Sequence, residues 1–428
     1  MRHSKASRLV SRGQGVTLVS SHRLERAVSE AYSTPMAPRL PVYLDYHATT
    51  PVDPRVFVAM RPYFTEVFGN AASRSHVFGM RAASAVEKAR EEVADLVGAN
   101  AKEIVFTSGA TEADNIAVLG AARARRARGT HVVVSAIEHR AVLDPCARLE
   151  AEGFRVTRVA PDRCGRTSAA AVEAALEPGT VLVTVMAASN EIGTLNPVSE
   201  IAAVCKSRGV LFHTDAVQAA GKVPLDVHLS GVDLLSLSAH KICGPKGAGA
   251  LFVRASNPRV TLDPILFGGG HERDLRPGTL DVPAIVGFGA AAAIARVEGA
   301  AESARVAALR DRLWEKLRAS VPGVSRNGDP GASLPGNLNV RFPGAPSDTV
   351  MMETRDLAVS AGSACTSASV EPSHVLLGIG LTKEEAHESI RFGLGRFTTP
   401  EEVEWAADAV AASVARIREA RGTARPAR

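Results

Sequence analysis

Residues 103–115 read EIVFTSGATEADN, an apolar run followed by a turn of small residues and the start of a helical segment. The apolar run predicts a buried strand, and the turn at 108–111 predicts the beginning of a helix. Backbone N–H groups at a helix N-terminus, together with the helix dipole, bind anions. We therefore expect a phosphate-binding turn here. Its residues are Ser108, Gly109, Ala110 and Thr111.

The same alternation of strand and helix continues along the chain. Unbroken apolar strands separated by helices indicate a mainly parallel sheet that is covered by helices on both faces. The sequence therefore predicts an α/β fold. Further strands are predicted at 131–137, 181–189, 210–215, 232–239 and 249–254, and helices at 84–99, 141–153 and 198–209.

The pattern changes near residue 300. A long amphipathic helix is expected at 302–319, a strand at 336–342 and a late helix at 401–417, which indicates a smaller α+β domain. The predicted organisation is an extension at 1–36, a large domain at 51–298, a small domain built from 37–50 and 299–415, and a basic tail at 416–428.

Charge and composition exclude several classes of function. The formal net charge is +5, but residues 1–40 hold seven Lys or Arg against two Glu, and residues 416–428 are also basic. The body of the chain is therefore not basic, and we expect no direct nucleic-acid binding. No uninterrupted apolar segment approaches the roughly 18 residues of a membrane span. Five scattered cysteines without C-x-x-C spacing favour a reducing, cytoplasmic location over disulfides or a metal site.

Residues 1–35 are rich in Ser and Arg, poor in acidic residues and without periodicity. Such a segment fits a transit-like presequence or a disordered extension. Met36, just before the regular pattern begins, is also a candidate start of translation. The sequence leaves these alternatives open.

Polar side chains follow the predicted strands one after another. Because the carboxyl ends of parallel strands meet at one edge of a sheet, these side chains should surround one ligand site. The residues are His139, Asn190, Asp215, Gln218, Ser238, His240 and Lys241.

A phosphate-binding turn, a carboxylate, an imidazole and a lysine at neighbouring strand ends are the parts of a pyridoxal 5'-phosphate site. The lysine holds the cofactor covalently, the carboxylate keeps the pyridine nitrogen protonated, and the imidazole lies against the ring. Each residue alone has an ordinary explanation, such as a helix cap or a solvated lysine. Their occurrence at successive strand ends favours the cofactor site.

From about Val42 to Val410, the chain resembles the cysteine desulfurases, within the class V aminotransferase-like, fold-type I pyridoxal phosphate enzymes. The long Ser- and Ala-rich cysteine loop is similar to that of the subgroup that serves iron–sulfur cluster assembly. The resemblance implies a large domain with a mainly parallel sheet of the seven-stranded type. It also implies a smaller C-terminal α+β domain. It rests on YLDYHATTPVDPRV (43–56), EIVFTSGATEADN (103–115), SNEIGT (189–194), HTDAVQAAGKVPLDV (213–227), SLSAHKICGPKGAGALFVR (236–254), GGGHERDLRPGT (268–279), SAGSACTSASVEPSHVL (360–376) and IRFGLGRFTT (390–399).

The resemblance assigns a role to each candidate cofactor residue. Lys241 would hold the cofactor, Asp215 would face its pyridine nitrogen and Gln218 its phenolic oxygen. His139 would stack on the ring and move protons. The residues assigned to cofactor binding at the phosphate end are Ala110, Thr111, Ser238 and His240, with Thr279 reaching the site of a neighbouring subunit, which implies a homodimer.

The resemblance also assigns the substrate site and the sulfur acceptor. Arg391 and Asn190 would bind the carboxylate of L-cysteine, with Asn190 also near the cofactor. Cys365 lies in a run of small residues without apolar periodicity, so packing does not explain it. Its thiolate would attack the substrate Sγ, leaving L-alanine and a persulfide that an iron–sulfur scaffold or another acceptor protein receives.

Three alternatives remain open at this stage. They are a selenocysteine lyase, another fold-type I lyase or aminotransferase with the same cofactor, and a non-catalytic partner-binding platform. The last would be expected to lose Lys241 or Cys365, and the chain keeps both. Four residues depart from the family pattern without removing a catalytic group: His47, Ala71, Pro277 and Cys243.

Overall fold

The computed structural model describes residues 38–361 and 372–422, which from Arg39 onward belong to one compact unit. Cys365, the predicted sulfur acceptor, lies outside the described residues.

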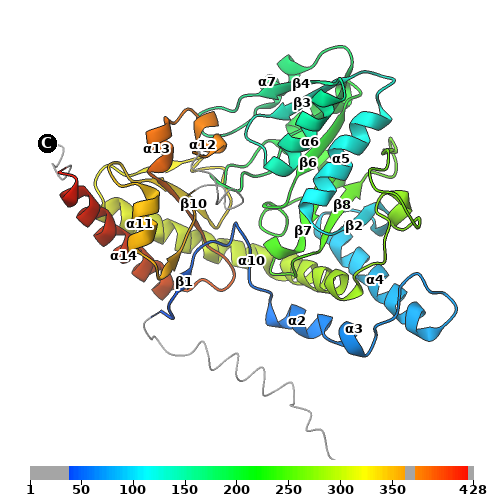
Figure 1. The fold of residues 1–428 in the computed structure, drawn as a ribbon, viewed down its shortest axis with the longest axis horizontal. Coiled ribbons are helices and arrows are strands. Elements are labelled where there is room, and N and C mark those ends of the chain that lie inside the picture. Colours follow the sequence, from blue (N-terminus) through cyan, green and yellow to red (C-terminus); the bar gives the residue numbers. More distant parts are fainter. Residues whose placement is uncertain (1–37, 362–371, 423–428) are drawn as a thin grey trace, which may run out of the picture. The chain divides into compact units, whose positions relative to one another are not determined.

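A seven-stranded sheet forms the centre of the larger part of this unit (Figure 1). The strands are β2 (Ile104–Thr107), β3 (His131–Ser135), β4 (Arg155–Val159), β5 (Thr180–Thr184), β6 (Leu211–Asp215), β7 (Leu234–Ser238) and β8 (Gly249–Val253). Their order in the sheet is β2-β8-β7-β6-β5-β3-β4, and β8 alone runs antiparallel to its neighbours. The predicted mainly parallel sheet of an α/β fold is confirmed.

Strand β4 was not among the predicted strands. It lies at the edge of the sheet, and two exposed arginines, Arg155 and Arg158, interrupt its more buried residues. An edge strand with one solvated side lacks the unbroken apolar run by which the other strands are recognised.

Both faces of the sheet are buried because successive residues of a strand point to opposite sides. In β8, Phe252 belongs to the hydrophobic cluster on one face and Leu251 to the cluster on the other. The helices on the Phe252 face are α4 (Val77–Leu96), α7 (Ala169–Ala175), α8 (Val198–Ser207), α9 (Val227–Ser230) and the first half of α10 (Val282–Ser320), and those on the Leu251 face are α5 (Ala110–Ala124) and α6 (Arg140–Ala151).

A smaller antiparallel sheet lies over the second half of α10. Buried residues such as Leu338 and Phe392 pack there against Leu313 and Val410 of two long helices. The elements are β9 (Ser325–Asn327), β10 (Asn337–Arg341) and β12 (Ser389–Gly393) in the order β12-β10-β9, the pair β1 (Val42–Tyr43) and β11 (Leu357–Ala358), and helix α14 (Pro400–Ala420). The remaining short helices are α2 (Pro54–Met60), α3 (Pro62–Thr65), α11 (Ser347–Glu353), α12 (His374–Gly378) and α13 (Lys383–His387).

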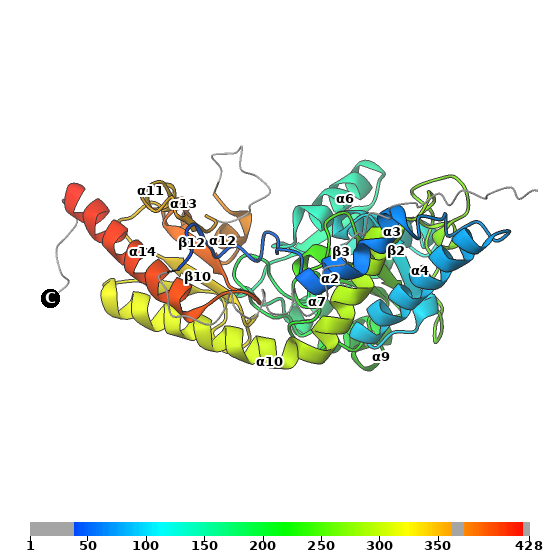
Figure 2. The same ribbon diagram turned by 90° about the horizontal axis from the view of Figure 1, so that it is seen from below.

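Helix α10 runs through the position at which the large and small domains were predicted to meet. It begins at Val282, well before the helix expected at 302–319, and the predicted boundary near 298 falls inside it. Figure 2 shows it passing beneath both sheets, with α14 alongside its second half. The helix continues because Phe288 packs in the core of the larger part and Leu313 in that of the smaller part.

Helix α14 continues to Ala420, so the first residues of the predicted basic tail at 416–428 are helical. Ile417 is buried in the smaller core, and Arg418 donates hydrogen bonds to the carbonyls of Pro322 and Pro343. Packing therefore extends the helix into the basic sequence.

Among the described residues, α10 is the one helix long and apolar enough to cross a membrane by length and composition. Half of its apolar window is buried inside the protein. Its position between two hydrophobic cores is that of a core helix.

Candidate functional site

A cavity of about 570 Å³ lies where the strands of the large sheet end. It brings together ten of the predicted site residues, from β-strand ends more than a hundred residues apart in sequence. They are Ala110, Thr111, His139, Asn190, Asp215, Gln218, Ser238, His240, Lys241 and Arg391. Thr279 is exposed and does not line this cavity, and Cys365 lies outside the described residues.

Lys241 is placed by a short 3-10 turn, Ala239–Lys241, directly after β7. Its Nζ donates hydrogen bonds to the carbonyl oxygens of His47 and Ala48, both at 2.7 Å. The preceding carbonyl, that of His240, accepts from both the backbone N–H and the hydroxyl of Thr50. The lysine and the segment that follows β1 are therefore fixed to each other.

Asp215 ends β6, and its Oδ1 accepts a hydrogen bond from the backbone N–H of Val217 at 2.9 Å. Burial, with the neighbouring Asp114 carboxylate adding to it, raises the pKa of Asp215 to about 6. Asp114 itself is completely buried, 3.5 Å from the Nε2 atom of His213. A positive charge beside Asp215 would favour its ionised form, as a protonated pyridine nitrogen would provide.

The predicted phosphate-binding turn lies at the N-terminus of α5, where Gly109 caps the helix without a side-chain hydrogen bond. A side chain added at Gly109 would meet nothing within 4 Å, so the turn borders open space. The N–H of Ser108 donates to the carboxylate of Glu112, which lies 3.3 Å from the Nε of Arg276.

His240 and Ser238 close the same end of the cavity. His240 Nδ1 lies 3.1 Å from the hydroxyl oxygen of Thr49. Burial, followed by the charge of Lys241 beside it, lowers the pKa of His240 to about 4. The imidazole is therefore neutral near pH 7 and can take part in hydrogen bonds without adding charge.

His139 is both a lining residue and the N-cap of α6. Its Nδ1 accepts a hydrogen bond from the backbone N–H of Ala141 at 3.1 Å. In the neutral ring the proton is consequently on Nε2. The helix start thus sets the orientation of the imidazole.

Arg391 enters the cavity from β12 of the smaller sheet and is 1% exposed. Its Nη2 lies 2.8 Å from Oδ1 of Asp45, and its Nη1 donates to the carbonyl oxygen of Asn190 at 3.0 Å. Sequence reasoning identified Arg391 and Asn190 but not Asp45, because nothing in the sequence links the segment after β1 to β12.

His47, one of the four departures, is buried in the cavity wall. Its Nδ1 lies 3.0 Å from Oε1 of Gln218, whose Nε2 donates to the His47 carbonyl at 2.9 Å. Burial, then the charges of Lys222 and Arg391, lower the pKa of His47 well below its usual value. The substitution therefore adds a neutral ring that holds Gln218.

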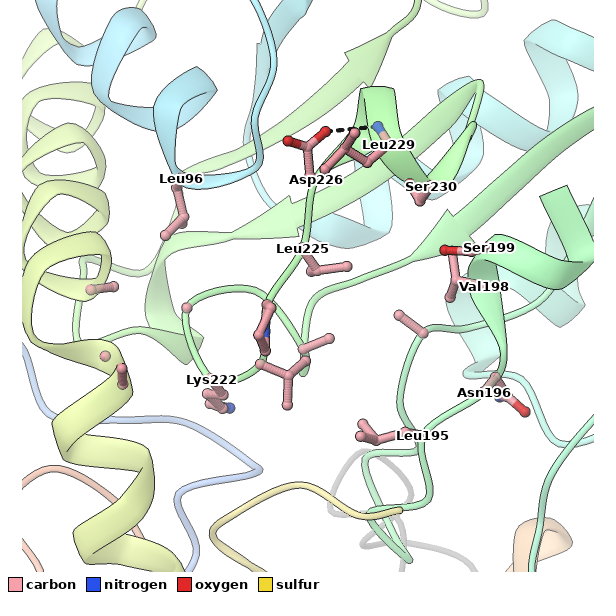
Figure 3. Close-up of a pocket in the computed structure, with 18 of the residues that line it drawn as sticks. Leu96, Leu195, Asn196, Val198, Ser199, Lys222, Leu225, Asp226, Leu229 and Ser230 are labelled. Atoms are coloured by element: carbon pink, nitrogen blue, oxygen red, sulfur yellow. Dashed lines mark hydrogen bonds between the residues drawn. The ribbon is translucent and has the colours of Figure 1, made fainter. Parts of the chain in front are cut away.

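Lys222 was also missed, although it stands in the quoted HTDAVQAAGKVPLDV segment. Its Nζ donates to Oε1 of Gln218 at 3.2 Å, and burial lowers its pKa to about 8. Lys222 also lines a second cavity, of about 770 Å³, whose wall includes Leu195, Leu225 and Asp226, the N-cap of α9 (Figure 3).

The other three departures lie outside the cavity lining. Cys243 is buried beside Lys241 and Lys222 around a void of about 30 Å³, and burial raises its pKa. Ala71 packs against the larger core, and Pro277 is partly buried near Thr279.

The two ends of the cysteine segment are fixed beside this site. Ser360 exchanges two backbone hydrogen bonds with Arg391. At the other end the hydroxyl of Ser373 donates to the carboxylate of Glu191, and His374 Nε2 lies 2.9 Å from the carbonyl oxygen of Glu138. Glu191 and Glu138 are the sequence neighbours of Asn190 and His139.

These residues fit pyridoxal 5'-phosphate in their chemistry. The open helix N-terminus suits a phosphate, the buried Asp215 suits a protonated ring nitrogen, and Lys241 is held at the cavity wall by two carbonyls.

A model of the family described as aminotransferase class-V matches residues 42–405, and the chain belongs to this family. The cysteine desulfurase IscS of Anaeromyxobacter sp. (strain Fw109-5) is 56% identical over 381 residues, which covers 89% of this chain and 94% of that protein. The cysteine desulfurase IscS of Shewanella woodyi is 51% identical over 383 residues, with the same coverage of 89% and 94%. Within the family, the chain is therefore a cysteine desulfurase, as the resemblance predicted.

Solved structures agree with this assignment. A NifS-like protein superposes with a TM-score of 0.81 at 35% identity, covering 88% of this chain and 99% of that one. A structure described as SspA in complex with cysteine gives 0.74 at 39% identity, covering 83% and 99%. The class V aminotransferase family depends on pyridoxal phosphate, in line with the cofactor that the cavity fits.

Proposed function

We propose that this protein binds pyridoxal 5'-phosphate and L-cysteine in the 570 Å³ cavity, releases L-alanine and keeps the sulfur as a persulfide on Cys365. The observation that carries the proposal is the convergence of Lys241, Asp215, His139 and Arg391 on that one cavity. Four groups of this chemistry serve a cofactor and an amino-acid substrate together.

The cofactor would be held at three places by residues of this chain. Lys241 would bind it covalently, the N-terminus of α5 with Thr111 would receive the phosphate, and Asp215 would face the ring nitrogen. Ser238 and His240 would complete the phosphate end, and Gln218 would face the phenolic oxygen; all of these residues line the cavity. When bound, pyridoxal 5'-phosphate supplies an electron sink for the negative charge that develops at the substrate Cα.

The substrate would be oriented by its carboxylate. Arg391 offers a planar guanidinium, which pairs with a carboxylate through two parallel hydrogen bonds, and Asn190 lies beside it. This pairing would fix the α-carbon relative to Lys241 and favour amines that carry a carboxylate over those that lack one.

Proton and sulfur transfer complete the reaction. The neutral His139 would present its Nε2–H to the cavity as a hydrogen-bond donor, because the Nδ1 lone pair accepts from the backbone N–H of Ala141, and a proton taken up by the ring would go to Nδ1. The Cys365 thiolate attacks Sγ of the substrate, forming an S–S bond as the Cβ–Sγ bond breaks. The electron pair of the broken bond stays with the carbon skeleton, which takes up protons and leaves as L-alanine.

The anchored ends of the cysteine segment support this role for Cys365. Ser360, five residues before Cys365, is paired with the substrate-binding Arg391. Ser373 and His374, at the other end, contact the residues next to Asn190 and His139. Both ends of the segment that carries Cys365 are therefore anchored beside the site where the sulfur would be released.

A homodimer is part of the proposal. Large apolar side chains on α2, on α3, in the segment between α3 and α4 and at the beginning of α4 are more than half exposed, and monomeric proteins rarely expose such a patch. We call this the α2–α4 apolar patch: Phe57, Phe64, Phe68, Val77 and Met80. Thr279 is exposed on the described chain, as expected of a residue that completes the site of a second subunit.

We also propose the acceptor of the persulfide, the cellular location and the division into domains. Since relatives that are 56% and 51% identical carry the name IscS, an iron–sulfur scaffold is the acceptor that we propose for the persulfide, in the cytoplasm. We retain the division into a large domain at 51–298 and a small domain of 37–50 and 299–415, with α10 shared between them.

The experiment that tests the function uses the purified, cofactor-loaded protein with L-cysteine and a thiol reductant. Alanine and sulfide should form in equal amounts, and Cys365→Ser should abolish both while keeping the visible absorbance of the cofactor. Pyruvate in place of alanine, or equal rates from the variant, would contradict the proposal.

A further inference from the structure

The residues around Arg391 accept hydrogen bonds from only some of the N–H groups of its guanidinium. Asp45 is its one charged partner among the described residues, and the Asn190 carbonyl accepts one further hydrogen bond. Its Nε is buried and has no partner within the described chain. Because an arginine has five N–H donors, one edge remains for a ligand of the cavity that Arg391 lines.

Asp45 is held rigidly in front of Arg391. The backbone on both sides of it pairs with β12: Gly393 N donates to the Leu44 carbonyl at 2.7 Å, and Tyr46 N donates to the Gly393 carbonyl at 3.1 Å. Only 16% of the Asp45 side chain is exposed. These bonds fix Asp45 to Gly393 of β12. Arg391 lies two residues before Gly393 in the same strand, so the Asp45 carboxylate is a fixed partner of Arg391.

The two charges have opposite effects on ligand binding. A buried guanidinium without a counter-ion is costly, so Asp45 stabilises the site before a ligand arrives. A ligand carboxylate on the same guanidinium then brings a second negative charge close to Asp45, and like charges repel strongly where water is excluded. Asp45 thus holds Arg391 in place and at the same time weakens the binding of carboxylates.

We propose that Asp45 is a positioning residue and built-in counter-ion of Arg391, and that it sets the affinity for the amino-acid carboxylate low enough for the product to leave. This inference rests on the proposed function, because it takes Arg391 as the carboxylate site.

The test compares L-alanine with L-alaninamide, which lacks the carboxylate, on the cofactor-loaded protein. Asp45→Asn keeps a hydrogen-bond acceptor for Arg391 but removes the charge. The dissociation constant of L-alanine, measured by calorimetry and by the change in cofactor absorbance, should fall about tenfold. The dissociation constant of L-alaninamide should stay the same.

Asp53→Asn is a matched control. Asp53 is buried and pairs with Arg396 at 2.8 Å, so its loss removes a similar ion pair outside the cavity. It should lower the melting temperature without changing the affinity for L-alanine. An unchanged or weaker affinity for L-alanine in Asp45→Asn, or a tighter affinity for both ligands, would overturn the role of Asp45.

Two further outcomes keep the test decisive. If no variant and not even the unaltered protein binds L-alanine, the proposed function fails and the inference falls with it. If Asp45→Asn does not fold, the double variant Asp45→Asn with Arg391→Gln, which removes both charges of this ion pair, should fold and bind the two ligands alike. Failure of the double variant to fold would contradict the counter-ion role.

Discussion

Ser360 and Arg391 exchange two backbone hydrogen bonds, with N···O distances of 3.2 Å from Ser360 and 2.7 Å from Arg391. The strand that presents Arg391, the proposed substrate-binding arginine, is thus also the anchor of the segment that carries Cys365. A displacement of β12 would disturb substrate orientation and sulfur acceptance together. The predictions below test the residues on each side of this connection.

Lys241→Ala should abolish both the visible absorbance of the bound cofactor and all turnover, because Lys241 is the lysine held at the cavity wall, whereas Lys246, which also lines the cavity, is exposed. Absorbance spectra of the purified variant, after incubation with pyridoxal 5'-phosphate and desalting, measure this. Lys206→Ala, on the surface of α8, is the control and should remain coloured. A coloured Lys241→Ala protein would show that another lysine holds the cofactor.

Cys365→Ser should bind the cofactor normally and fail to form a protein persulfide, because a hydroxyl does not accept the sulfur. Alkylation of persulfides after brief exposure to L-cysteine, followed by peptide mapping, measures this. The matched controls are Cys164→Ser and Cys243→Ser, a partly exposed and a buried cysteine outside the cavity. Persulfide at undiminished yield in Cys365→Ser would mean that a different cysteine is the acceptor.

Asp215→Asn should stabilise the cofactor-free protein at pH 7.5. The pKa of Asp215 is raised from 3.8 to about 6, so the folded protein binds this proton more tightly than the unfolded chain. The contribution of Asp215 to the free energy of unfolding is therefore most favourable below pH 4. It is lost as the pH rises to 6. Removing the titration should raise the free energy of unfolding by on the order of 2 kcal/mol at pH 7.5 and by little near pH 4.

Urea unfolding of the cofactor-free protein at several pH values measures the Asp215 effect. Asp95→Asn, exposed on α4, should show no such dependence on pH. The same Asp215→Asn variant should bind the cofactor more weakly, because it cannot balance a protonated ring nitrogen. An equal change in stability at pH 4 and pH 7.5 would disprove the assigned titration.

Phe64→Glu combined with Phe68→Glu should convert the protein to a monomer, because charges in the α2–α4 apolar patch cannot be buried between subunits. Sedimentation velocity measures the mass, and activity should fall as the phosphate site loses Thr279 of the second subunit. Leu229→Glu is the control: this leucine is 87% exposed and lies beside the second cavity. A dimer that persists in the double variant would place the interface elsewhere.

The sheet and most of the site were predictable because they depend on local patterns. Unbroken apolar runs predicted six of the seven strands, and the polar residues at their ends predicted seven of the 23 residues that line the cavity. Strand β4 was not predicted because Arg155 and Arg158 interrupt its apolar pattern at the sheet edge.

Contacts between distant segments were not predictable in the same way. Asp45 and Arg391 are 346 positions apart, and their pairing depends on β12 lying beside the segment after β1. Helix α10 was expected to begin later because its alanine-rich first half has little amphipathic contrast, being buried against the larger core. The departure at His47 was visible, but its contact with Gln218 required the fold.

The most direct test of the central claim is the intact mass of the cofactor-loaded protein after brief exposure to L-cysteine, with alanine quantified in the same sample. We predict a gain of one sulfur atom per chain, located on Cys365, with an equal amount of alanine. No sulfur gain and no alanine from a protein that visibly binds the cofactor would contradict the claim and assign the site to a different pyridoxal phosphate reaction.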